Sequence, residues 1–370
     1  MNEHPFKLNK QLILPLVVGL GQFSGINIYY LSLLVTAVLV TVGTSFLKSD
    51  LSRNRYLLFF ILSMLITAAA ALRQKIPDTY SVLMWAQFTF TAVIPLIIAG
   101  REKLLKSFFV VIQFIFVLDF LTNLLLLLGV DLPYTGTPVV RPGETFPRLP
   151  GVMNNTLSSG YTSFVLLCYL LDKDSFKQQP FFRLLYTGLV LINILFAGTN
   201  RIFILIMVVL VIRYIPAVRQ SKWLLSSFAA LVIAATVALT LLTALSNKSN
   251  FLRSQLWIIS VEQIAQKPLA GHGVYYPDTS LAKPELESLK KLGVTESFPL
   301  SVAYSYGMVS LALFLVFIVH AFSKISKAPA YRFQQGIFLG LSIELFFGGT
   351  LSNTLFAFLY FLCLYVITDE

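Results

Sequence analysis

An arginine, Arg201, stands at the start of the apolar run in AGTNRIFILIM, residues 197–207. Placing arginine near a bilayer centre costs at least ~2.5–3.5 kcal/mol, so such a residue usually has a function. Arg148 and Arg253 lie in two long polar segments that we expect on the same side of the membrane as Arg201. A planar guanidinium suits phosphate or pyrophosphate, so the three arginines would together form an anion site. The alternative for Arg201 is a side chain that reaches from the bilayer to its interface.

A carboxylate, Glu296 in VTESFPLSVAYSYG, stands where the second polar segment meets an apolar run. Partial desolvation beside a bilayer makes a carboxylate a stronger base, which favours a role as general base. The alternative is an ordinary loop acid near a helix N-terminus, with Ser297 as the helix cap. His272, in the turn GHG, is weak evidence for catalysis, because a single histidine between glycines has many other roles.

Four polar residues lie inside apolar runs: Asp119, Glu344, Gln87 and Gln113. Polar groups in lipid are expensive, so each should face the interior of a helix bundle. For the two glutamines we expect structural hydrogen bonds between helices. Asp119 and Glu344 either pair with arginines or line a cavity, and the sequence leaves both interpretations open.

The composition indicates a membrane protein. Of the 370 residues, 56% are apolar and 12% are charged, whereas a soluble domain carries about 25% charged residues. The excess of 28 basic over 17 acidic residues is typical of the cytoplasmic loops of such proteins, so we expect no nucleic-acid partner. Cys168 and Cys363 lie in apolar runs, which predicts neither a disulfide framework nor a thiolate metal site. No phosphate-binding glycine loop or metal-ligand spacing is present.

The sequence predicts an all-α fold: a polytopic bundle of about twelve transmembrane helices, with ten or eleven as alternatives, in a single membrane domain over residues 1–370. The first run resembles a signal peptide but lacks a cleavage motif, so we interpret it as an uncleaved span. The expected spans lie near residues 11–25, 28–47, 55–72, 80–99, 104–128, 156–172, 181–198, 201–216, 223–245, 298–320, 333–349 and 351–367.

Lysine and arginine placement predicts that both termini are cytoplasmic. Two long segments, 129–155 and 246–297, then fall on the outer face. The second begins with LRSQLWIISVEQIAQKP, whose Trp257, Val261, Ile264 and Ala265 share one face of a helix lying in the interface plane. Pro268 and the turn GHG end that helix, and PELESLKKLG, residues 284–293, predicts a second short one.

Four stretches resemble the bacterial O-antigen polymerase and O-antigen ligase superfamily. RLPGVMNNTLSSGYTSF is similar to its R-x-x-G-x-x-x-N-x-x-x-x-G stretch, and AGTNRIFIL to its T-G-S-R segment. LRSQLWIISVEQIAQKPLAGHGVYYP resembles the outer-loop pattern that ends in P-L-x-G-x-G, and ESFPLSVAYSYGMVSLALFLVF the span after it. The order and spacing match over residues 140–320, approximately.

The resemblance implies metal-independent glycosyl transfer, without a cofactor, at the outer face of the bacterial cytoplasmic membrane. A glycan on a polyprenyl diphosphate would pass to an acceptor hydroxyl. Arg201 and Arg253 match the arginines expected to hold the diphosphate, and Glu296 stands at the position of the base. Arg148, Asn154, Asn155, Ser297 and His272 are the further residues expected to bind substrate. Membrane lipid, a flippase and a chain-length regulator are the expected partners.

One departure separates two subtypes. Ligases of the superfamily carry His-Asn where this chain has Glu296-Ser297, whereas the polymerase residue at this point is commonly acidic. We therefore expect a polymerase for O-antigen, capsule or exopolysaccharide repeat units. The alternatives are a ligase that passes finished glycan to a lipid or protein, and a transporter of lipid-linked sugars. A transporter should show internal repeats and short loops, which this chain lacks.

Overall fold

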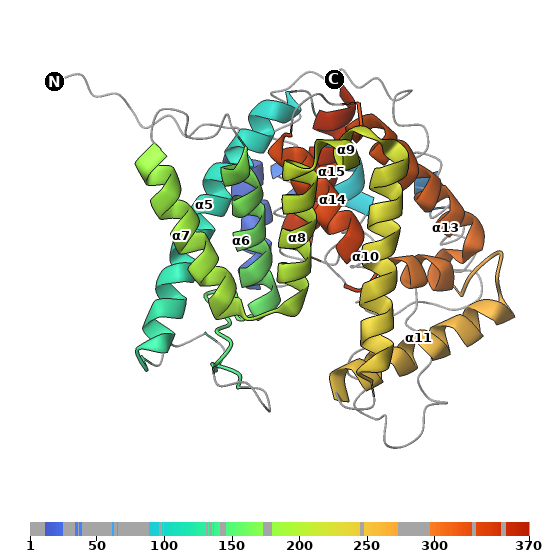
Figure 1. The fold of residues 1–370 in the computed structure, drawn as a ribbon, viewed down its shortest axis with the longest axis horizontal. Helices are drawn as coiled ribbons and strands as arrows, with labels where there is room; N and C mark the ends of the chain where they lie inside the picture. Colours follow the sequence, from blue (N-terminus) through green and yellow to red (C-terminus); the bar gives the residue numbers. More distant parts are fainter. Residues whose placement is uncertain are drawn as a thin grey trace.

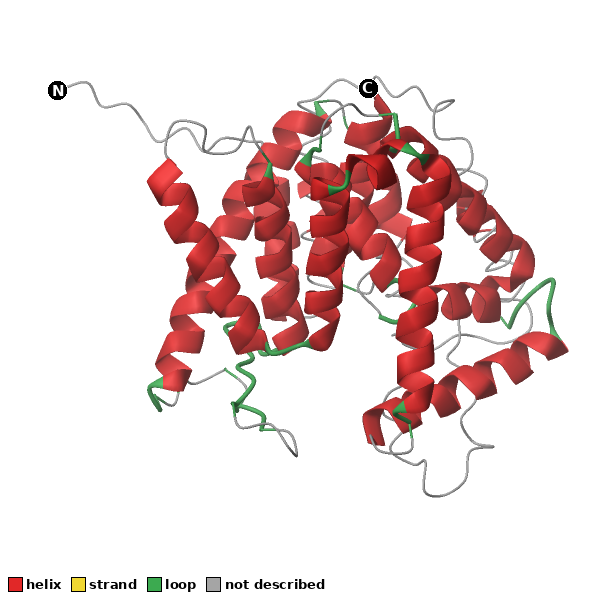
Figure 2. Ribbon diagram, viewed as in Figure 1, coloured by secondary structure: helices red, strands yellow, loops and turns green. Residues whose placement is uncertain are grey.

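The structure is a computed structural model of the 370-residue chain. It describes residues 12–24, 34–35, 37–38, 61–62, 65, 89–95, 98, 100–130, 132, 135, 137–140, 146–172, 180–244, 248–272, 297–327, 331–348 and 353–369. Within these ranges every regular element is a helix (Figure 2). Val139 and Arg148 form an isolated antiparallel bridge. The all-α prediction is confirmed for this part of the chain.

The helices of the described residues form one bundle (Figure 1). They are α1 (Ile13–Ser24), α5 (Arg101–Leu127), α6 (Thr156–Leu171), α7 (Pro180–Ala197), α8 (Asn200–Tyr214), α9 (Pro216–Gln220), α10 (Lys222–Leu242), α11 (Lys248–Gln266), α13 (Phe298–Ile325), α14 (Phe333–Glu344) and α15 (Thr354–Asp369).

The expected spans from residue 104 onwards each coincide closely with one of these helices. Four of them, α5, α7, α10 and α13, are long and apolar enough to cross a bilayer. The helices α6, α8, α14 and α15 are shorter, with 16, 15, 12 and 16 residues. The count of twelve spans stays a prediction, because the spans expected at 28–47, 55–72 and 80–99 lie largely outside the described residues.

The core is built around α14 and α15. Residues 354–366 of α15 are all buried, as are residues 335–344 of α14. The α14 helix packs against α6, α8 and α15, and α15 packs against α1, α5 and α13. In contrast, α7 and α10 expose leucines to the surroundings, such as Leu184 and Leu231. Burial inside and exposed leucine outside is the pattern of a bundle whose outer helices face lipid.

One end of the bundle carries the described parts of both long polar segments. In Figure 1, α11 lies across the direction of α8 and α10, at the end where α6 and α8 begin. Residues 146–155 lead into α6 at the same end. These residues of the two segments therefore lie at one end of the bundle, and their placement on the outer face of a membrane stays a prediction. The transverse course of α11 agrees with a helix that lies in an interface plane.

The turn after α11 is locked against a break in α13. Gly307 interrupts α13 with φ 81° and ψ 171°, a conformation open to glycine alone. A Cβ at Gly307 would stand 2.0 Å from the carbonyl oxygen of Leu269. The backbone N–H of Met308 donates to the Pro268 carbonyl at 2.7 Å. These contacts fix α11 relative to the membrane helices.

The residues of the predicted apolar face of α11 are divided between the bundle and the surface. Ile264 is buried against Ala303 and Tyr304 of α13, but Val261 and Ala265 are exposed. The buried face also carries polar residues of α11: Ser254, Ser260 and Gln263. The helix therefore packs on α13 with a more polar face than its sequence predicts and leaves an apolar stripe outward.

Candidate functional site

Arg201 lies in the first turn of α8, at the end of the bundle that carries α11 (Figure 1). Gly198 ends α7 with φ 57°, and its N–H donates to the Ile194 carbonyl at 3.1 Å. This turn reverses the chain and begins α8 at Asn200. The side chain of Arg201 is 17% exposed, and its Nη1 is 3.8 Å from Oε1 of Glu344. Arg201 therefore forms an ion pair instead of only reaching toward the interface.

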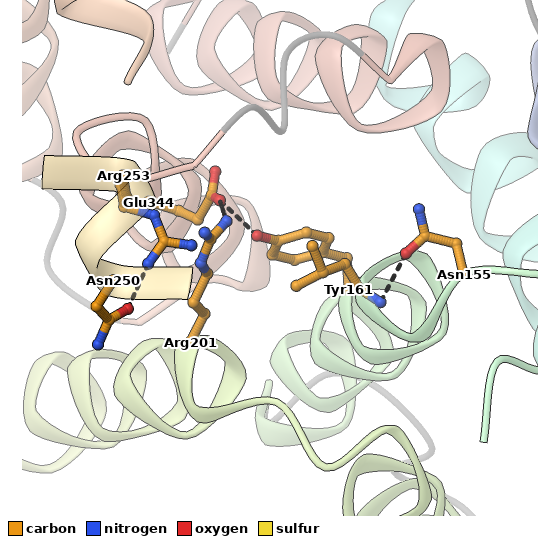
Figure 3. Close-up of polar contacts among 7 residues, drawn as sticks. Asn155, Tyr161, Arg201, Asn250, Arg253 and Glu344 are labelled. Carbon is orange, nitrogen blue, oxygen red and sulfur yellow. Dashed lines mark hydrogen bonds and ion pairs between the residues drawn. The ribbon is translucent and has the colours of Figure 1, made fainter. Parts of the chain in front are cut away.

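Glu344 is the last residue of α14 and is fully buried. The hydroxyl of Tyr161, from α6, donates a hydrogen bond to its Oε1 (Figure 3). Gly348 leaves the space that this carboxylate fills, since a Cβ there would lie 1.4 Å from Oε1. A buried carboxylate is costly unless charged and hydrogen-bonding partners compensate it. Residues of α6 and α8 supply those partners, so Glu344 holds the Arg201 guanidinium.

Arg253 enters from α11. Its Nη1 donates to Oδ1 of Asn250 at 2.8 Å, and Nδ2 of Asn250 donates to Oγ1 of Thr243 at 2.7 Å. This chain of hydrogen bonds ties Arg253 to the end of α10. Figure 3 shows the guanidinium of Arg253 pointing toward that of Arg201, beside Glu344. Two of the three predicted arginines thus point toward one another in this view.

Arg148 is buried against the turn that precedes α8. The N–H of Leu149 donates to the Phe196 carbonyl at 2.8 Å. A Cβ on Gly198 would meet Cγ of Arg148 at 3.0 Å, so the Arg148 side chain lies directly on that turn. Arg148 is thereby placed to hold the backbone just before Arg201.

Ser297 is buried at the N-cap position of α13. Its side chain forms no capping hydrogen bond to that helix. The N–H of the next residue, Phe298, donates to the Leu345 carbonyl at 2.8 Å. This bond places the start of α13 directly beside the end of α14, where Glu344 lies. Glu296, the predicted base, lies outside the described residues.

The two predicted asparagines shape the start of α6. Oδ1 of Asn155 accepts a hydrogen bond from the N–H of Leu157 at 2.9 Å and so caps the helix. Asn154 has φ 52°, and its N–H donates to the Gly151 carbonyl at 3.2 Å. Both residues are exposed. Their contacts assign them a structural role in the turn, and substrate binding by them stays a prediction.

Asp119 anchors the same turn from within the bundle. Its carboxylate accepts hydrogen bonds from the N–H of Val152 at 3.1 Å, from Nδ2 of Asn193 at 3.0 Å and from the hydroxyl of Ser159. It pairs with none of the three arginines in a contact that the structure shows. Asp119 therefore joins α5, α6 and α7 to the turn before α6.

His272 lies in the turn that follows α11. Its Nε2 is 2.7 Å from the Gln263 carbonyl, and its ring stacks on Tyr304 at a centroid distance of 4.8 Å. Its own N–H donates to the Tyr304 carbonyl at 2.7 Å. These contacts fasten the turn to α13, which accounts for the histidine in structural terms.

Glu344 and Tyr161 are the residues that sequence reasoning left out of the site. The sequence singles out Glu344 as an intramembrane carboxylate that pairs with an arginine or lines a cavity, and the structure shows the pairing. Tyr161 gives no signal of its own in the sequence. The two guanidinium groups and the one carboxylate carry a net positive charge, which favours an anion.

No model of a known protein family matches the chain, and no curated protein matches it.

Proposed function

We propose that this protein is a membrane glycosyltransferase that polymerises oligosaccharide repeat units carried on polyprenyl diphosphate. The single observation that carries the proposal is that the guanidinium of Arg253, from α11, points toward that of Arg201, which pairs with Glu344 (Figure 3). Two like charges repel each other, so an arrangement that points them toward one space favours a bound anion. A diphosphate offers oxygens to both guanidinium groups.

The position of the arginines supports a lipid-linked ligand. Arg201 begins an apolar helix, and α11 crosses the same end of the bundle. This is the depth at which the headgroup of a lipid diphosphate would lie if its chain remained in the bilayer. The N–H groups at the start of α8 also favour negative charge there.

In the proposed reaction, the acceptor hydroxyl oxygen attacks the anomeric carbon of the donor glycan. The bond from that carbon to the diphosphate oxygen breaks, and the polyprenyl diphosphate leaves with the bonding electrons. Glu296 takes the proton of the acceptor hydroxyl. Arg201 and Arg253 stabilise the charge that develops on the leaving diphosphate, which is electrostatic work that fixed charges do well.

The proposal places the chain in the bacterial cytoplasmic membrane, with the Arg201 end of the bundle outside. Deletion of the gene in its own host, followed by gel electrophoresis of surface glycan, tests it. A ladder that collapses to a single repeat unit on its acceptor supports a polymerase. Loss of all attached glycan, with polymer accumulating on the lipid carrier, would indicate the ligase, and unchanged glycan would contradict both enzymes.

Complementation of the deletion strain then tests the site. Arg201→Ala should leave the strain without long chains. Lys106→Ala is the matched control, because Lys106 is an exposed cation of α5 that takes no part in the site, and it should restore the ladder. Immunoblots of the membrane fraction establish that both variants are inserted.

A further inference from the structure

A second group of cations lies at the other end of α8. Arg213 is in the last turn of α8 and Arg219 is in α9. Arg201 and Arg213 are twelve residues apart on one helix, which corresponds to about 18 Å at 1.5 Å per residue. The second group is therefore separate from the candidate site and stands near the opposite membrane face.

Arg213 is held by aromatic rings. Its guanidinium carbon is 5.3 Å from the centroid of the Tyr331 ring and 5.7 Å from that of Tyr214. Its Nε is buried and donates to no acceptor in the part of the chain that the structure describes. No carboxylate within the described ranges forms an ion pair with Arg213. A partly buried guanidinium with an unused donor is costly, so an added acceptor beside Arg213 would stabilise it.

Arg219 adds a like charge at the same place. Its side chain is almost fully buried. Burial lowers the pKa of Arg219 below its usual value, and the positive charge of Arg213 lowers it further. Asp172 also faces Tyr331, but its Oδ2 accepts a hydrogen bond from the N–H of Phe333 at 3.0 Å. Two arginine charges therefore lie close enough at this end of α8 to influence each other.

The surroundings of the two arginines are those of a membrane interface. Tyr214 and Trp223 are 67% and 74% exposed. Nζ of Lys222, the first residue of α10, lies 5.2 Å from the centroid of the Trp223 ring. Exposed Tyr and Trp at the ends of apolar helices lie at headgroup depth, and basic pockets between helix ends bind anionic lipid headgroups.

We propose that Arg213 and Arg219 bind the phosphate of an anionic phospholipid, whose acyl chains lie along the exposed apolar surface of α10. The phosphate oxygens would accept hydrogen bonds from the guanidinium group of Arg213, and the negative charge of the phosphate would favour the nearby charge of Arg219. Lys222 would add a third cation at the rim. This inference depends on the bundle lying in a membrane, and it is independent of the proposed glycosyl transfer.

The test measures lipid retention by the purified full-length chain in detergent, by native mass spectrometry, with phosphatidylglycerol and phosphatidylcholine as probes. Wild-type protein should retain phosphatidylglycerol preferentially. Each of Arg213→Gln and Arg219→Gln should reduce that retention about fivefold, whereas Lys106→Gln, which removes an exposed charge of α5, should reduce it much less. Arg213→Lys keeps the charge and loses the guanidinium, so it should retain an intermediate amount.

Three outcomes would overturn the inference. The first is equal retention of the two lipids by wild-type protein, a result that requires no variant to fold. The second is equal phosphatidylglycerol retention by wild type and by a monodisperse Arg213→Gln protein. The third is displacement of the bound lipid by millimolar inorganic phosphate, which would identify a soluble phosphate as the ligand instead of a lipid.

Discussion

Gly348→Ala is the sharpest perturbation that the structure offers, because it moves the Glu344 carboxylate without removing it. The added Cβ would stand 1.4 Å from Oε1 and 2.3 Å from Cδ of Glu344. Ordinary contact between such atoms needs at least 3.4 Å, so the carboxylate oxygen must move by at least about 2 Å. The carboxylate ends a flexible side chain, so the backbone of α14 can stay in place.

A shift of this size breaks the hydrogen bond from Tyr161 and disturbs the ion pair with Arg201. A hydrogen bond to a charged group contributes about 1.5–3 kcal/mol. If that energy serves to orient Arg201 for a leaving diphosphate, the rate should fall by about tenfold to a hundredfold. The main loss should be in kcat. The guanidinium of Arg201 would still be present but turned away from the diphosphate, so it would lose contacts made in the transition state.

The assay uses the purified protein with a polyprenyl-diphosphate-linked repeat unit and follows chain growth on a gel. Gly188→Ala in α7 is the matched control, because a Cβ at that position meets nothing within 4 Å. Tyr161→Phe should reproduce the loss by removing only the donor hydroxyl. A Gly348→Ala protein with the melting temperature and the kcat of wild type would refute the idea that Glu344 positions Arg201.

Three further predictions concern the two arginines, Glu296 and the break in α13 at Gly307. Arg201→Ala and Arg253→Ala should each abolish long glycan chains in the host. Arg253→Lys should also lack long chains if paired hydrogen bonds to the diphosphate matter. Long chains in both alanine variants would contradict a role of these arginines in diphosphate binding. Glu296→Gln should block transfer while the protein still binds the lipid-linked donor, so an unchanged rate would exclude it as the base. Gly307→Ala should lower the unfolding free energy by at least about 1–3 kcal/mol, measured in detergent by thermal unfolding, and an unchanged melting temperature would contradict the lock between α11 and α13.

The sequence predicts the helices well because each membrane helix is an apolar run with clear ends. The run expected at 156–172 is α6 (Thr156–Leu171), and the run expected at 181–198 is α7 (Pro180–Ala197). Hydropathy predicts these elements since lipid requires every backbone N–H and C=O to be bonded within the segment. It predicts less well how α11 packs, because the partner of its polar face is α13, which follows it by more than thirty residues.

The sequence predicts only part of the site, because a sequence pattern is local whereas some contacts of the site join distant residues. Arg201 and Arg253 stand out because a charge at the edge of an apolar run, or at the start of an amphipathic helix, is visible in one short window. The contact between Tyr161 and Glu344 joins residues 183 positions apart, and no local pattern contains it. Asn155 shows the converse, since its position before α6 fits a motif and its contact is an ordinary helix cap.

The two ends of α8 explain why so apolar a helix carries two arginines. At its start, Arg201 pairs with a buried carboxylate of the neighbouring helix; at its end, Arg213 meets ring faces and a second arginine. Glu344 compensates the charge of Arg201, so a diphosphate bound to Arg201 would either compete with Glu344 or use donors of Arg201 that Glu344 leaves available. Arg213 forms no ion pair with a carboxylate of the described residues. An anionic lipid bound to Arg213 would therefore offset the cost of burying its charge at the end of α8.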